Sequence, residues 1–450
     1  MPRRPVALAV VVVALAALAG AALLVEFDAT VLGRGVLERA GAAIGGRLSA
    51  RAVRLRPLTG LVLDGVEASS SFTGGRATAT IDRLVLDHRL SRLLRGEIAV
   101  DGLVLQRPKV RLVETSAPRP GARTASPAGA AVAGLGRLSL RVSRIDVQDA
   151  TVELQAPGQA HPTVVKGLDL HLRDIALEPG PAPLLVGLSG VGDVRVAEVS
   201  FARSRALDVQ GSIRLGGGHL KTDTVRFRTD QGPFEATLDI DLARLPLAYA
   251  LTLHGDPLDV AAIMGAPGFG AGTLRLEARG AGAEADGLQG RGELRVAAGT
   301  LPATPTLRAI EQALGRTHIV GAAYQPIEAP FRIERGRVVL DGLHLRTDQA
   351  GLDLSGWASL AGPIELSLAV HTPREGLAPG GVGGGVLDLL TDDQGRVVVP
   401  LKVTGTPQAP HVGPDTAAVT SQMERGGARK LLEKAGQGIG GLFKKKPRER

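Results

Sequence analysis

Cysteine and asparagine are absent from the 450 residues, and aromatic residues make up only 2% of them. Without cysteine the chain can form no disulfide and no thiolate-ligated zinc or iron–sulfur site. Without asparagine, tight turns depend on glycine, proline and Asp-Gly pairs. Hydrophobic residues still make up 44%, so Leu, Val, Ala and Ile supply nearly all of the apolar surface. Codon bias of the genome is one explanation of this composition. The alternative is that the protein uses a smooth aliphatic surface for its function.

Signatures of catalysis and metal binding are also missing. The nine histidines are scattered, and no H-E-x-x-H pair occurs. Gly436, Gly438 and Gly441 spell G-x-G-x-x-G, but no strand precedes them, so we interpret the match as chance. The phosphate-binding pattern G-x-x-x-x-G-K-[ST] and the nucleophile pattern G-x-S-x-G are both absent. The sequence therefore predicts a protein without enzymatic activity, catalytic residues, metal or cofactor.

The positive charge is confined to the two ends of the chain. The formal net charge is +8. Residues 421–450 contain nine Lys and Arg against three Glu, which gives 9 − 3 = +6, and Arg3 with Arg4 adds +2. The remainder is therefore neutral, 8 − 6 − 2 = 0. A nucleic-acid-binding domain needs a basic footprint on its folded body, so no nucleic-acid partner is predicted.

The N-terminal segment has the character of a membrane anchor. Val6 to Val25 is a run of twenty uncharged residues that follows Arg3 and Arg4, and a helix of this length crosses a hydrocarbon core of ~30 Å. The preceding positive charge predicts a cytoplasmic N-terminus and an exported body. A cleaved signal peptide ending near Ala19-Gly20-Ala21 is the alternative, although its apolar region would be unusually long.

Most of the remaining chain alternates between apolar and polar residues. Leu168, Leu170 and Leu172 alternate with Asp169, His171 and Arg173, and 364–371 repeats the pattern. About sixteen segments of this kind predict antiparallel strands with one apolar and one polar face. The phrases LVLDGV (61–66) and IAVDGLVL (98–105) recur, and RTDQ occurs at 228–231 and 346–349. We interpret the Asp-Gly and RTDQ phrases as turns between strands.

Helices are predicted at three places between the strands. Val31, Leu32, Val36, Ala40 and Ile44 recur at near-helical spacing before Gly45-Gly46. Asp256-Pro257 is expected to open a helix that Gly265 ends. Thr304-Pro305 is expected to open a helix over PTLRAIEQAL (305–314), with Leu307, Ile310 and Leu314 on one stripe.

A long sheet can shield its apolar face from water in two ways. The ordinary one is a β-sandwich, in which each apolar face packs against another sheet. The other is a curved groove of aliphatic side chains that holds the acyl tails of lipids. For the groove, the apolar phase offers twelve candidate lining residues: Leu274, Leu276, Phe331, Ile333, Leu343, Leu345, Leu352, Leu354, Ile364, Leu366, Leu368 and Val370.

Six segments, two near the N-terminus and four in the C-terminal part, resemble the AsmA family in their order along the chain. GRLSARAVRLRPLTGLVLDGVEAS (46–69) is similar to the opening of these proteins, and LSRLLRGEIAVDGLVLQRPKVRLVE (90–114) to the element that follows. GAGTLRLEARG (270–280) and LQGRGELRVAAGTL (288–301) resemble the family's C-terminal region. So do FRIERGRVVLDGLHLRTDQAGLDLSGWASL (331–360) and VVVPLKVTGTPQAPHVGPD (397–415). The resemblance includes the N-terminal anchor, with a diverged middle part.

The resemblance implies a single-pass inner-membrane protein of a diderm bacterium whose body lies in the periplasm. It implies a mostly β fold: a transmembrane helix, then a long antiparallel, curved β-groove with a few short helices. Phospholipid is the implied partner, bound for transport between the inner and outer membranes or for outer-membrane homeostasis, with periplasmic or outer-membrane proteins as further partners. A β-rich scaffold for outer-membrane protein assembly is the alternative.

Changes in composition, together with the resemblance, predict six segments. They are a cytoplasmic stub and anchor (1–28), an AsmA-like helix with a first β segment (29–115), a Pro/Ala/Gly linker (116–135), a middle β segment (136–265), a C-terminal AsmA-like β region (266–410) and a basic tail (411–450).

Overall fold

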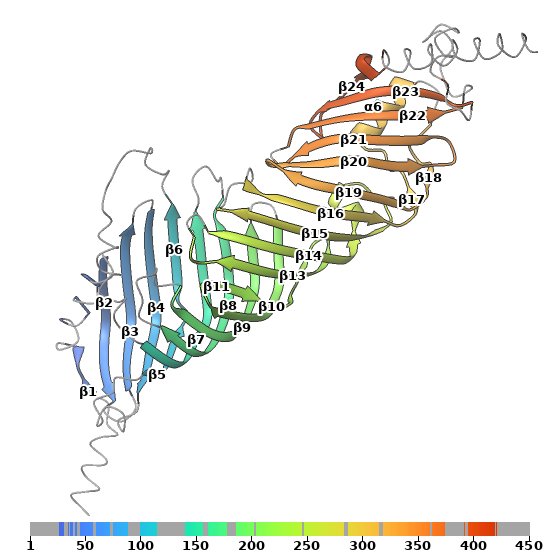
Figure 1. Cartoon of the computed structure of the whole chain (residues 1–450). Helices are drawn as coiled ribbons and strands as arrows, with labels where there is room; N and C mark the ends of the chain where they lie inside the picture. The colour runs from blue at the N-terminus through green and yellow to red at the C-terminus, as the bar shows by residue number, and fades with distance from the viewer. Residues whose placement is uncertain are drawn as a thin grey trace, which may run out of the picture. The chain divides into compact units, whose positions relative to one another are not determined.

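The computed structural model (Figure 1) is built almost entirely from β-strands in the residues that it describes. These residues are 27–30, 35, 37–38, 41–42, 46–56, 60–72, 75–88, 100–114, 140–155, 161–177, 186–201, 204–244, 247–282, 287–314, 318–360, 362–373, 391, 395–418 and 420. The chain divides into two compact units, Met1–Ala250 and Leu251–Arg450. Most of the predicted first and middle β segments falls in the first unit.

Unit 1 contains thirteen strands in its described part, and at two places a pair of short strands shares one position in the sheet. Its strands are β1 (Phe27–Asp28), β2 (Gly46–Arg56), β3 (Gly60–Phe72), β4 (Gly75–His88), β5 (Val100–Gln106), β6 (Lys109–Glu114), β7 (Leu140–Gln155), β8 (Thr163–Leu177), β9 (Leu188–Phe201), β10 (Ser204–Gly216), β11 (His219–Thr222), β12 (Val225–Thr229) and β13 (Gly232–Asp241). Neighbours in sequence pair in order, except that β5 and β6 lie end to end between β4 and β7. β11 and β12 lie end to end between β10 and β13 in the same way.

The prediction of a purely antiparallel sheet is wrong at one point. β5 and β6 both run parallel to β7, whereas the other printed pairs of unit 1 are antiparallel. Parallel neighbours need a connection of a dozen or more residues that returns the chain to the same end of the sheet. Residues 115–139 form this connection and contain the predicted linker, and they lie outside the described residues.

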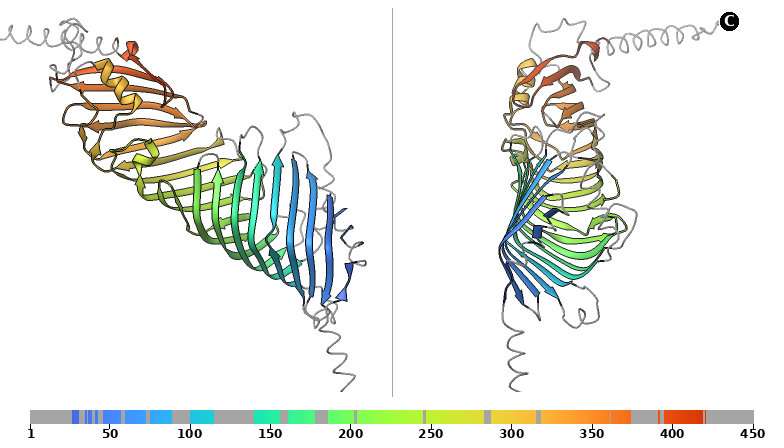
Figure 2. Two further views of the ribbon diagram at one scale, coloured as in Figure 1. Left: turned by 180° about the vertical axis from the view of Figure 1, so that it is seen from behind. Right: turned by 90° about the vertical axis from the view of Figure 1, so that its left-hand side faces the viewer.

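The Asp-Gly phrases lie inside strands rather than in turns, which corrects the prediction. Gly65 of β3 has φ +59°, and the register continues unchanged past it, since Asp64 pairs with Arg83 and Val66 with Ile81. Asp149 of β7 and Asp208 of β10 have positive φ at register shifts. Bulges at such shifts add one residue and increase the local bend and twist of a strand. They accompany the strong curvature of the blue and green strands in Figure 2.

The RTDQ phrases form hairpin turns, as predicted. The hydroxyl of Thr229 accepts a hydrogen bond from the Gln231 amide at 3.1 Å, between β12 and β13. Thr347 makes the equivalent bond with the Gln349 amide at 3.1 Å, between strands β20 and β21 of unit 2. Threonine hydroxyls stabilise these turns by replacing a backbone acceptor.

Unit 2 is an antiparallel sheet with one apolar face covered by a helix. Its elements are β14 (Ala248–Asp259, which begins at the unit boundary), α5 (Val260–Met264), β15 (Ala271–Ala281), β16 (Gln289–Val296), β17 (Gly299–Thr300), α6 (Pro305–Leu314), β18 (Ala323–Tyr324), β19 (Ile327–Glu334), β20 (Arg337–Arg346), β21 (Gly351–Ser359), β22 (Ile364–Thr372), β23 (Val397–Gly405) and β24 (Pro410–Pro414). β15, β16 and β19 to β24 pair successively, while β17 and β18 form a separate pair.

Helix α6 has the bounds that the sequence predicts, and it supplies part of the core. The Thr304 hydroxyl accepts from the Leu307 amide at 3.1 Å and caps the helix. Ile310 and Leu314 are buried in one cluster with Leu368 and Val370 of β22. Leu307, the third residue of the predicted stripe, packs against the same cluster. Figure 2 shows α6 lying across the orange strands of this unit.

The other helix predictions are met less closely. α5 begins at Val260 rather than at Pro257, because Asp259 is the residue whose side chain caps the Ala262 amide. Gly265 ends it in a left-handed conformation, as predicted. In the first predicted helix, residues 35, 37, 38, 41 and 42 are helical, and the five apolar residues of the predicted stripe lie outside the described residues. β24 also continues four residues beyond Pro410, where the strands were expected to end.

The predicted anchor, Val6 to Val25, lies outside the described residues, as does the tail beyond residue 420. Within the part of the chain that the structure describes, no helix has both the length and the apolar character required to cross a membrane.

The α6 packing predicts a stability effect. Ile310 and Leu314 are 4% and 3% exposed, so truncating either to alanine removes buried methyl groups and leaves a cavity. We expect Leu314→Ala to lower the free energy of unfolding by about 2–5 kcal/mol, measured by urea denaturation of the full chain. The exposed neighbour provides the control: Gln312→Ala should stay within about 0.5 kcal/mol of wild type. Equal effects for the two variants would contradict the packing.

Candidate functional site: an uncovered apolar face

On strands β4 to β10 of unit 1, the side chains on the apolar side of the sheet form one continuous surface. We call this surface the aliphatic face. Leu84 of β4 pairs with Leu105 of β5, which pairs with Val147 of β7. Val147 pairs with Leu170 of β8, and Leu170 with Val194 of β9. A second row runs beside the first: Leu86, Leu103, Ile145, Leu172, Gly192 and Ile213. The register thus aligns aliphatic side chains from strands up to 130 residues apart in sequence.

The two central rows of the aliphatic face carry no formal charge. Outside these rows, the register places Glu114, the last residue of β6, in phase with Leu112, and the carboxylate oxygens of Asp101 in β5 are buried. The bulge in β7 keeps the apolar residues on one side, since it takes up the extra residue where their spacing lengthens from two to three, from Val147 to Ala150. The two rows therefore present no charged side chain to a ligand.

The side chains of the aliphatic face are only half-buried, although they lie on central strands. Leu105, Val147, Leu170 and Val194 all remain half-exposed. A second packed layer would bury such residues, as α6 does in unit 2, where Val370 is 0% exposed. Val142, Ala150, Ile175 and Val196 are the buried exceptions on this phase. No second sheet among the described residues closes the aliphatic face, so the simple sandwich does not describe unit 1.

The end of the face at β2 and β3 is packed. Val53, Leu63 and Val66 form a buried cluster there, against which Ala29 and Leu37 pack from the N-terminal segment. The backbone amide of Ala29 also donates to the Val53 carbonyl at 2.8 Å. The uncovered part of the face therefore begins beyond β3.

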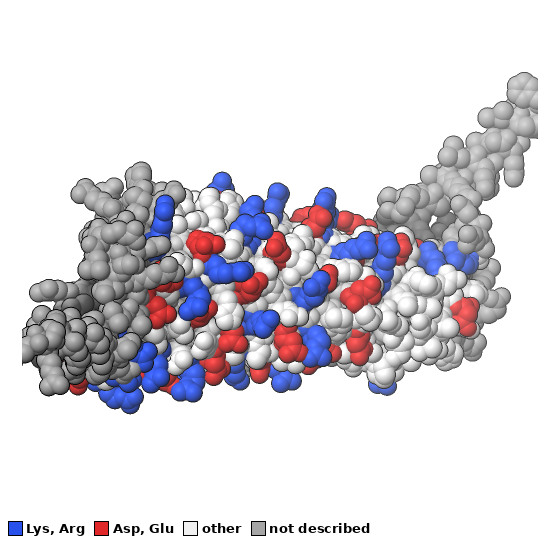
Figure 3. All heavy atoms as spheres, turned by 90° about the horizontal axis from the view of Figure 1, so that it is seen from below, with Lys and Arg blue, Asp and Glu red and all other residues white. Residues whose placement is uncertain are grey.

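The opposite face of the strands carries intermixed charges of both signs (Figure 3). Asp64 of β3 accepts hydrogen bonds from Arg54 and from Arg83, the latter at 2.9 Å. Burial raises the pKa of Asp64, but these bonds and charges outweigh it and hold the pKa below its usual value. Asp146 pairs with His171 at 2.9 Å and with Arg144 at 2.8 Å in the same manner. These pairs are near the surface and contribute little energy each, and they keep this face in water.

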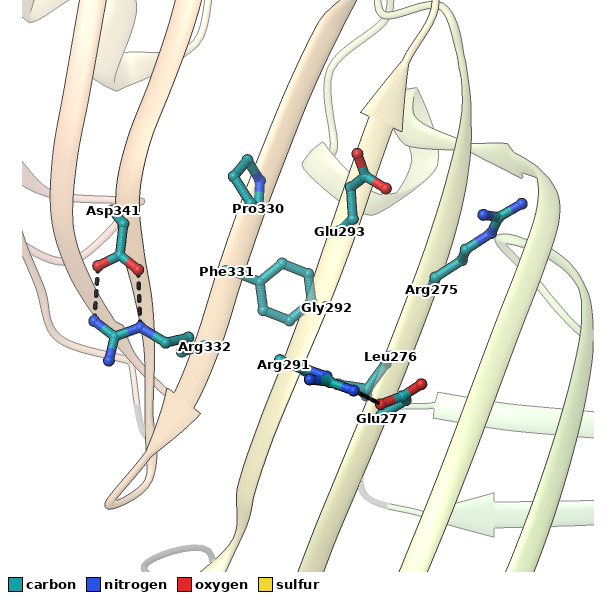
Figure 4. Close-up of a pocket in the computed structure, with 10 residues that line it drawn as sticks. All are labelled: Arg275, Leu276, Glu277, Arg291, Gly292, Glu293, Pro330, Phe331, Arg332 and Asp341. Carbon is teal, nitrogen blue, oxygen red and sulfur yellow. Dashed lines mark hydrogen bonds and ion pairs between the residues drawn. The ribbon is translucent and has the colours of Figure 1, made fainter.

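Two hollows lie on the polar face of unit 2. The first, of about 390 Å³, is lined by both charge signs (Figure 4). Arg332 donates to both carboxylate oxygens of Asp341, at 2.8 and 2.7 Å, and Arg291 donates to Glu277 at 2.7 Å. Figure 4 shows the Phe331 ring against Gly292, where an added Cβ would lie 2.4 Å from the ring. The lining charges largely neutralise one another, and nothing in the arrangement activates a nucleophile.

The second hollow, of about 310 Å³, includes Asp353 of β21. Its carboxylate lies 2.8 Å from His344 Nδ1, 2.9 Å from His371 Nε2 and 2.7 Å from Arg346 Nη1. Burial raises the pKa of Asp353, but the hydrogen bonds from His344 and Arg346 outweigh it and lower the pKa to about 2. The carboxylate is already saturated by its neighbours, and the described residues contain no group of three or more side chains arranged to hold a metal.

The twelve predicted lining residues all lie in unit 2 and, by the register, on one face of its sheet. Six are buried: Ile333, Leu345, Leu352, Ile364, Leu368 and Val370. The other six are half-buried: Leu274, Leu276, Phe331, Leu343, Leu354 and Leu366. Leu345, Leu352, Leu368 and Val370 belong to the cluster that α6 covers, so they pack against protein in this structure.

The residues of the aliphatic face were missing from that list, although the sequence contained a signal for them. The strands of 140–241 alternate as regularly as those of the C-terminal region. No amphipathic helix interrupts the described part of this stretch, whereas α6, with its apolar stripe, interrupts the C-terminal region. An apolar face without a matching apolar cover is the stronger candidate for a ligand surface.

Comparison with known proteins adds no assignment. No protein-family model matches the chain, and no curated protein matches its sequence.

The Asp353 cluster predicts a pH effect on stability. The folded pKa of about 2 lies below the ordinary value of 3.8. The ionised carboxylate therefore stabilises the fold above about pH 4, and this contribution is lost as the pH falls toward 2. We expect Asp353→Asn to be less stable than wild type at pH 6, with the difference in the free energy of unfolding shrinking toward pH 2. Asp348→Asn, at an exposed turn position, is the control. A difference that stays constant with pH would rule out the assigned pairing.

Proposed function

We propose that the aliphatic face binds the acyl tails of phospholipids and that the protein is a non-enzymatic lipid carrier of the bacterial envelope. The observation that carries this proposal is the apolar surface over β4 to β10, whose two central rows carry no charged residue and have no second layer over them among the described residues. Exposed contiguous apolar surface is unusual in soluble proteins and marks interaction sites for proteins, ligands or lipids.

Hydrocarbon suits this surface better than a polar ligand does. Acyl chains offer no hydrogen bonds, and each buried CH₂ contributes about 0.8 kcal/mol whatever its position. The six strand positions of the aliphatic face, from β4 to β10 with β5 and β6 end to end, would span about 25–30 Å at ~4.8 Å each. Such a surface is long enough for acyl tails, and its uniform aliphatic composition allows a tail to shift along it without breaking directional contacts.

The location follows from the sequence features outside the described residues. We propose that Val6 to Val25 anchors the chain in the inner membrane, with a cytoplasmic N-terminus and the β units in the periplasm. The resemblance of the strand phrases to the AsmA family supports transport of phospholipid between the inner and outer membranes, or outer-membrane homeostasis, as the physiological role. The basic tail would add attraction to anionic lipid, at ~1 kcal/mol per cation near a membrane surface.

A scaffold for outer-membrane protein assembly is the second candidate. The observation that favours it is the closed core of unit 2, where Val370, Val397 and Val403 are at most 1% exposed. A scaffold needs such a rigid body, but it does not need the uncovered face of unit 1.

Crosslinking at two adjacent residues tests the proposal. Val194 lies half-buried on the aliphatic face of β9, and Arg195 is exposed on the opposite face. A photo-crosslinking amino acid at Val194 should give phospholipid adducts in cells, and the same group at Arg195 should not, because only the first touches bound tails. Adducts are identified by mass spectrometry. Equal labelling at the two positions, or none at either, would refute the lipid face.

A charged substitution provides an independent measurement. Leu170→Glu places a carboxylate in the middle of the aliphatic face, where hydrocarbon would have to desolvate it. We expect this variant to lose most of the phospholipid that co-purifies with the wild-type chain, as seen by native mass spectrometry. Arg195→Glu is the matched control and should retain it. Circular dichroism of both variants verifies folding, and full lipid retention by folded Leu170→Glu would favour the scaffold.

A further inference from the structure

The connection between β16 and β19 is far longer than its geometry requires. These strands are directly paired from Gly290–Ile333 to Val296–Ile327. A hairpin with this register closes with two residues, yet residues 297–326 intervene. We call the described part of this connection, 297–314 and 318–326, the excursion.

The two ends of the excursion are hydrogen-bonded to each other. β17 and β18 pair at its two ends, and the Leu301 amide donates to the Ala322 carbonyl at 2.9 Å. The Gly321 amide donates back to the Leu301 carbonyl at 2.7 Å. On the far side, the Glu311 carboxylate of α6 accepts from the Ile319 amide at 2.9 Å. These bonds fix the orientation of α6, which lies in sequence between the paired strands β17 and β18.

The excursion covers only part of the apolar face of unit 2. Leu301, Ile310, Leu314 and Ile319 are each at most 4% exposed and share one cluster with sheet residues from β16 to β23. Leu274, Leu276 and Phe331, on the same face of β15 and β19, lie outside that cluster and remain half-buried. Because the cluster itself crosses β19 to reach Val296 of β16, the sealed and unsealed parts of the face differ mainly in their position along the strands.

Hydrocarbon from a membrane cannot displace the excursion. Burial of one aliphatic side chain shifts an equilibrium by roughly ten- to a hundredfold, so four of them leave an opened state below about one part in ten thousand. A tail that leaves a bilayer is already surrounded by hydrocarbon. Under the excursion it would only replace side chains that are already packed there, whereas on the aliphatic face it covers surface that is otherwise in water. A ligand shifts a conformational equilibrium only by its differential affinity for the two states, and here that difference is small.

We propose that the excursion is a fixed stop that limits hydrocarbon binding on the apolar face of unit 2. Acyl tails contact the strip of Leu274, Leu276 and Phe331 and are excluded from Leu345, Leu352, Leu368 and Val370. This assignment rests on the proposed lipid binding and adds to it which part of the unit 2 face takes part. It also makes the excursion a permanent part of the fold rather than a gate.

Crosslinking on both sides of the stop tests the boundary in the full-length chain. A photo-crosslinking group at Leu276 should capture phospholipid, and the same group at Leu368 should not, with Arg275 and Ser367 as the exposed-face controls. Replacing residues 297–326 by Asn-Gly, which closes the existing β16–β19 register, should produce adducts at Leu368. Adducts at Leu368 in the otherwise unmodified chain would overturn the stop.

Hydrogen exchange provides a second measurement that does not depend on a shortened chain folding. For a fixed stop, the α6 amides near Ile310 and Leu314 should be protected to within about tenfold of those of β22. Protection that is lower by a thousandfold or more would identify a gate and contradict the proposal. The Val194 experiment distinguishes failure of the stop from failure of the lipid face. Labelling at both Val194 and Leu368 would refute the stop alone. No labelling at Val194 would refute the lipid face itself.

Discussion

The rest of the structure depends on how each unit deals with the apolar side of an alternating sheet. A strand that places Leu and Val on one face and Arg and Asp on the other cannot leave both faces in water without cost. In unit 1 the apolar side from β4 to β10 has no second layer among the described residues, and its side chains stay half-buried. In unit 2 part of the same kind of surface is closed by α6 and its flanking residues.

Keeping one face largely apolar over so many strands requires control of which side of the sheet each side chain occupies. A single extra residue would turn the rest of a strand inside out. The bulges prevent this. The extra residue of the strand lies where successive apolar residues are three positions apart instead of two, so the apolar residues stay on the same side of the sheet. Gly65 supplies a left-handed conformation in β3 without steric cost, while Asp149 and Asp208 adopt it at the register shifts as the polar residues that tolerate it best. The same bulges bend the strands, so curvature and phase have one cause.

The polar face has a complementary role. Cross-strand pairs such as Asp64 with Arg54 and Arg83, or Asp353 with Arg346, hold opposite charges on neighbouring strands. Each is partly solvated and contributes modestly to stability. Together they make the reverse orientation of the sheet unfavourable, since it would bury those charges and expose the leucines. The two faces therefore specify the register jointly.

Local signals in the sequence determined the strand-rich fold, the single apolar face, the RTDQ turns and helix α6 with its stripe of Leu307, Ile310 and Leu314. Each of these depends on residues that are close together in the chain. The parallel pairing of β5 and β6 with β7, the position of the Asp-Gly phrases inside strands, and the choice of which leucines are covered were decided only by the tertiary structure. The reason is physical: Leu170 and Leu368 have the same alternating surroundings, and only contacts with α6, more than fifty residues away in sequence, bury Leu368.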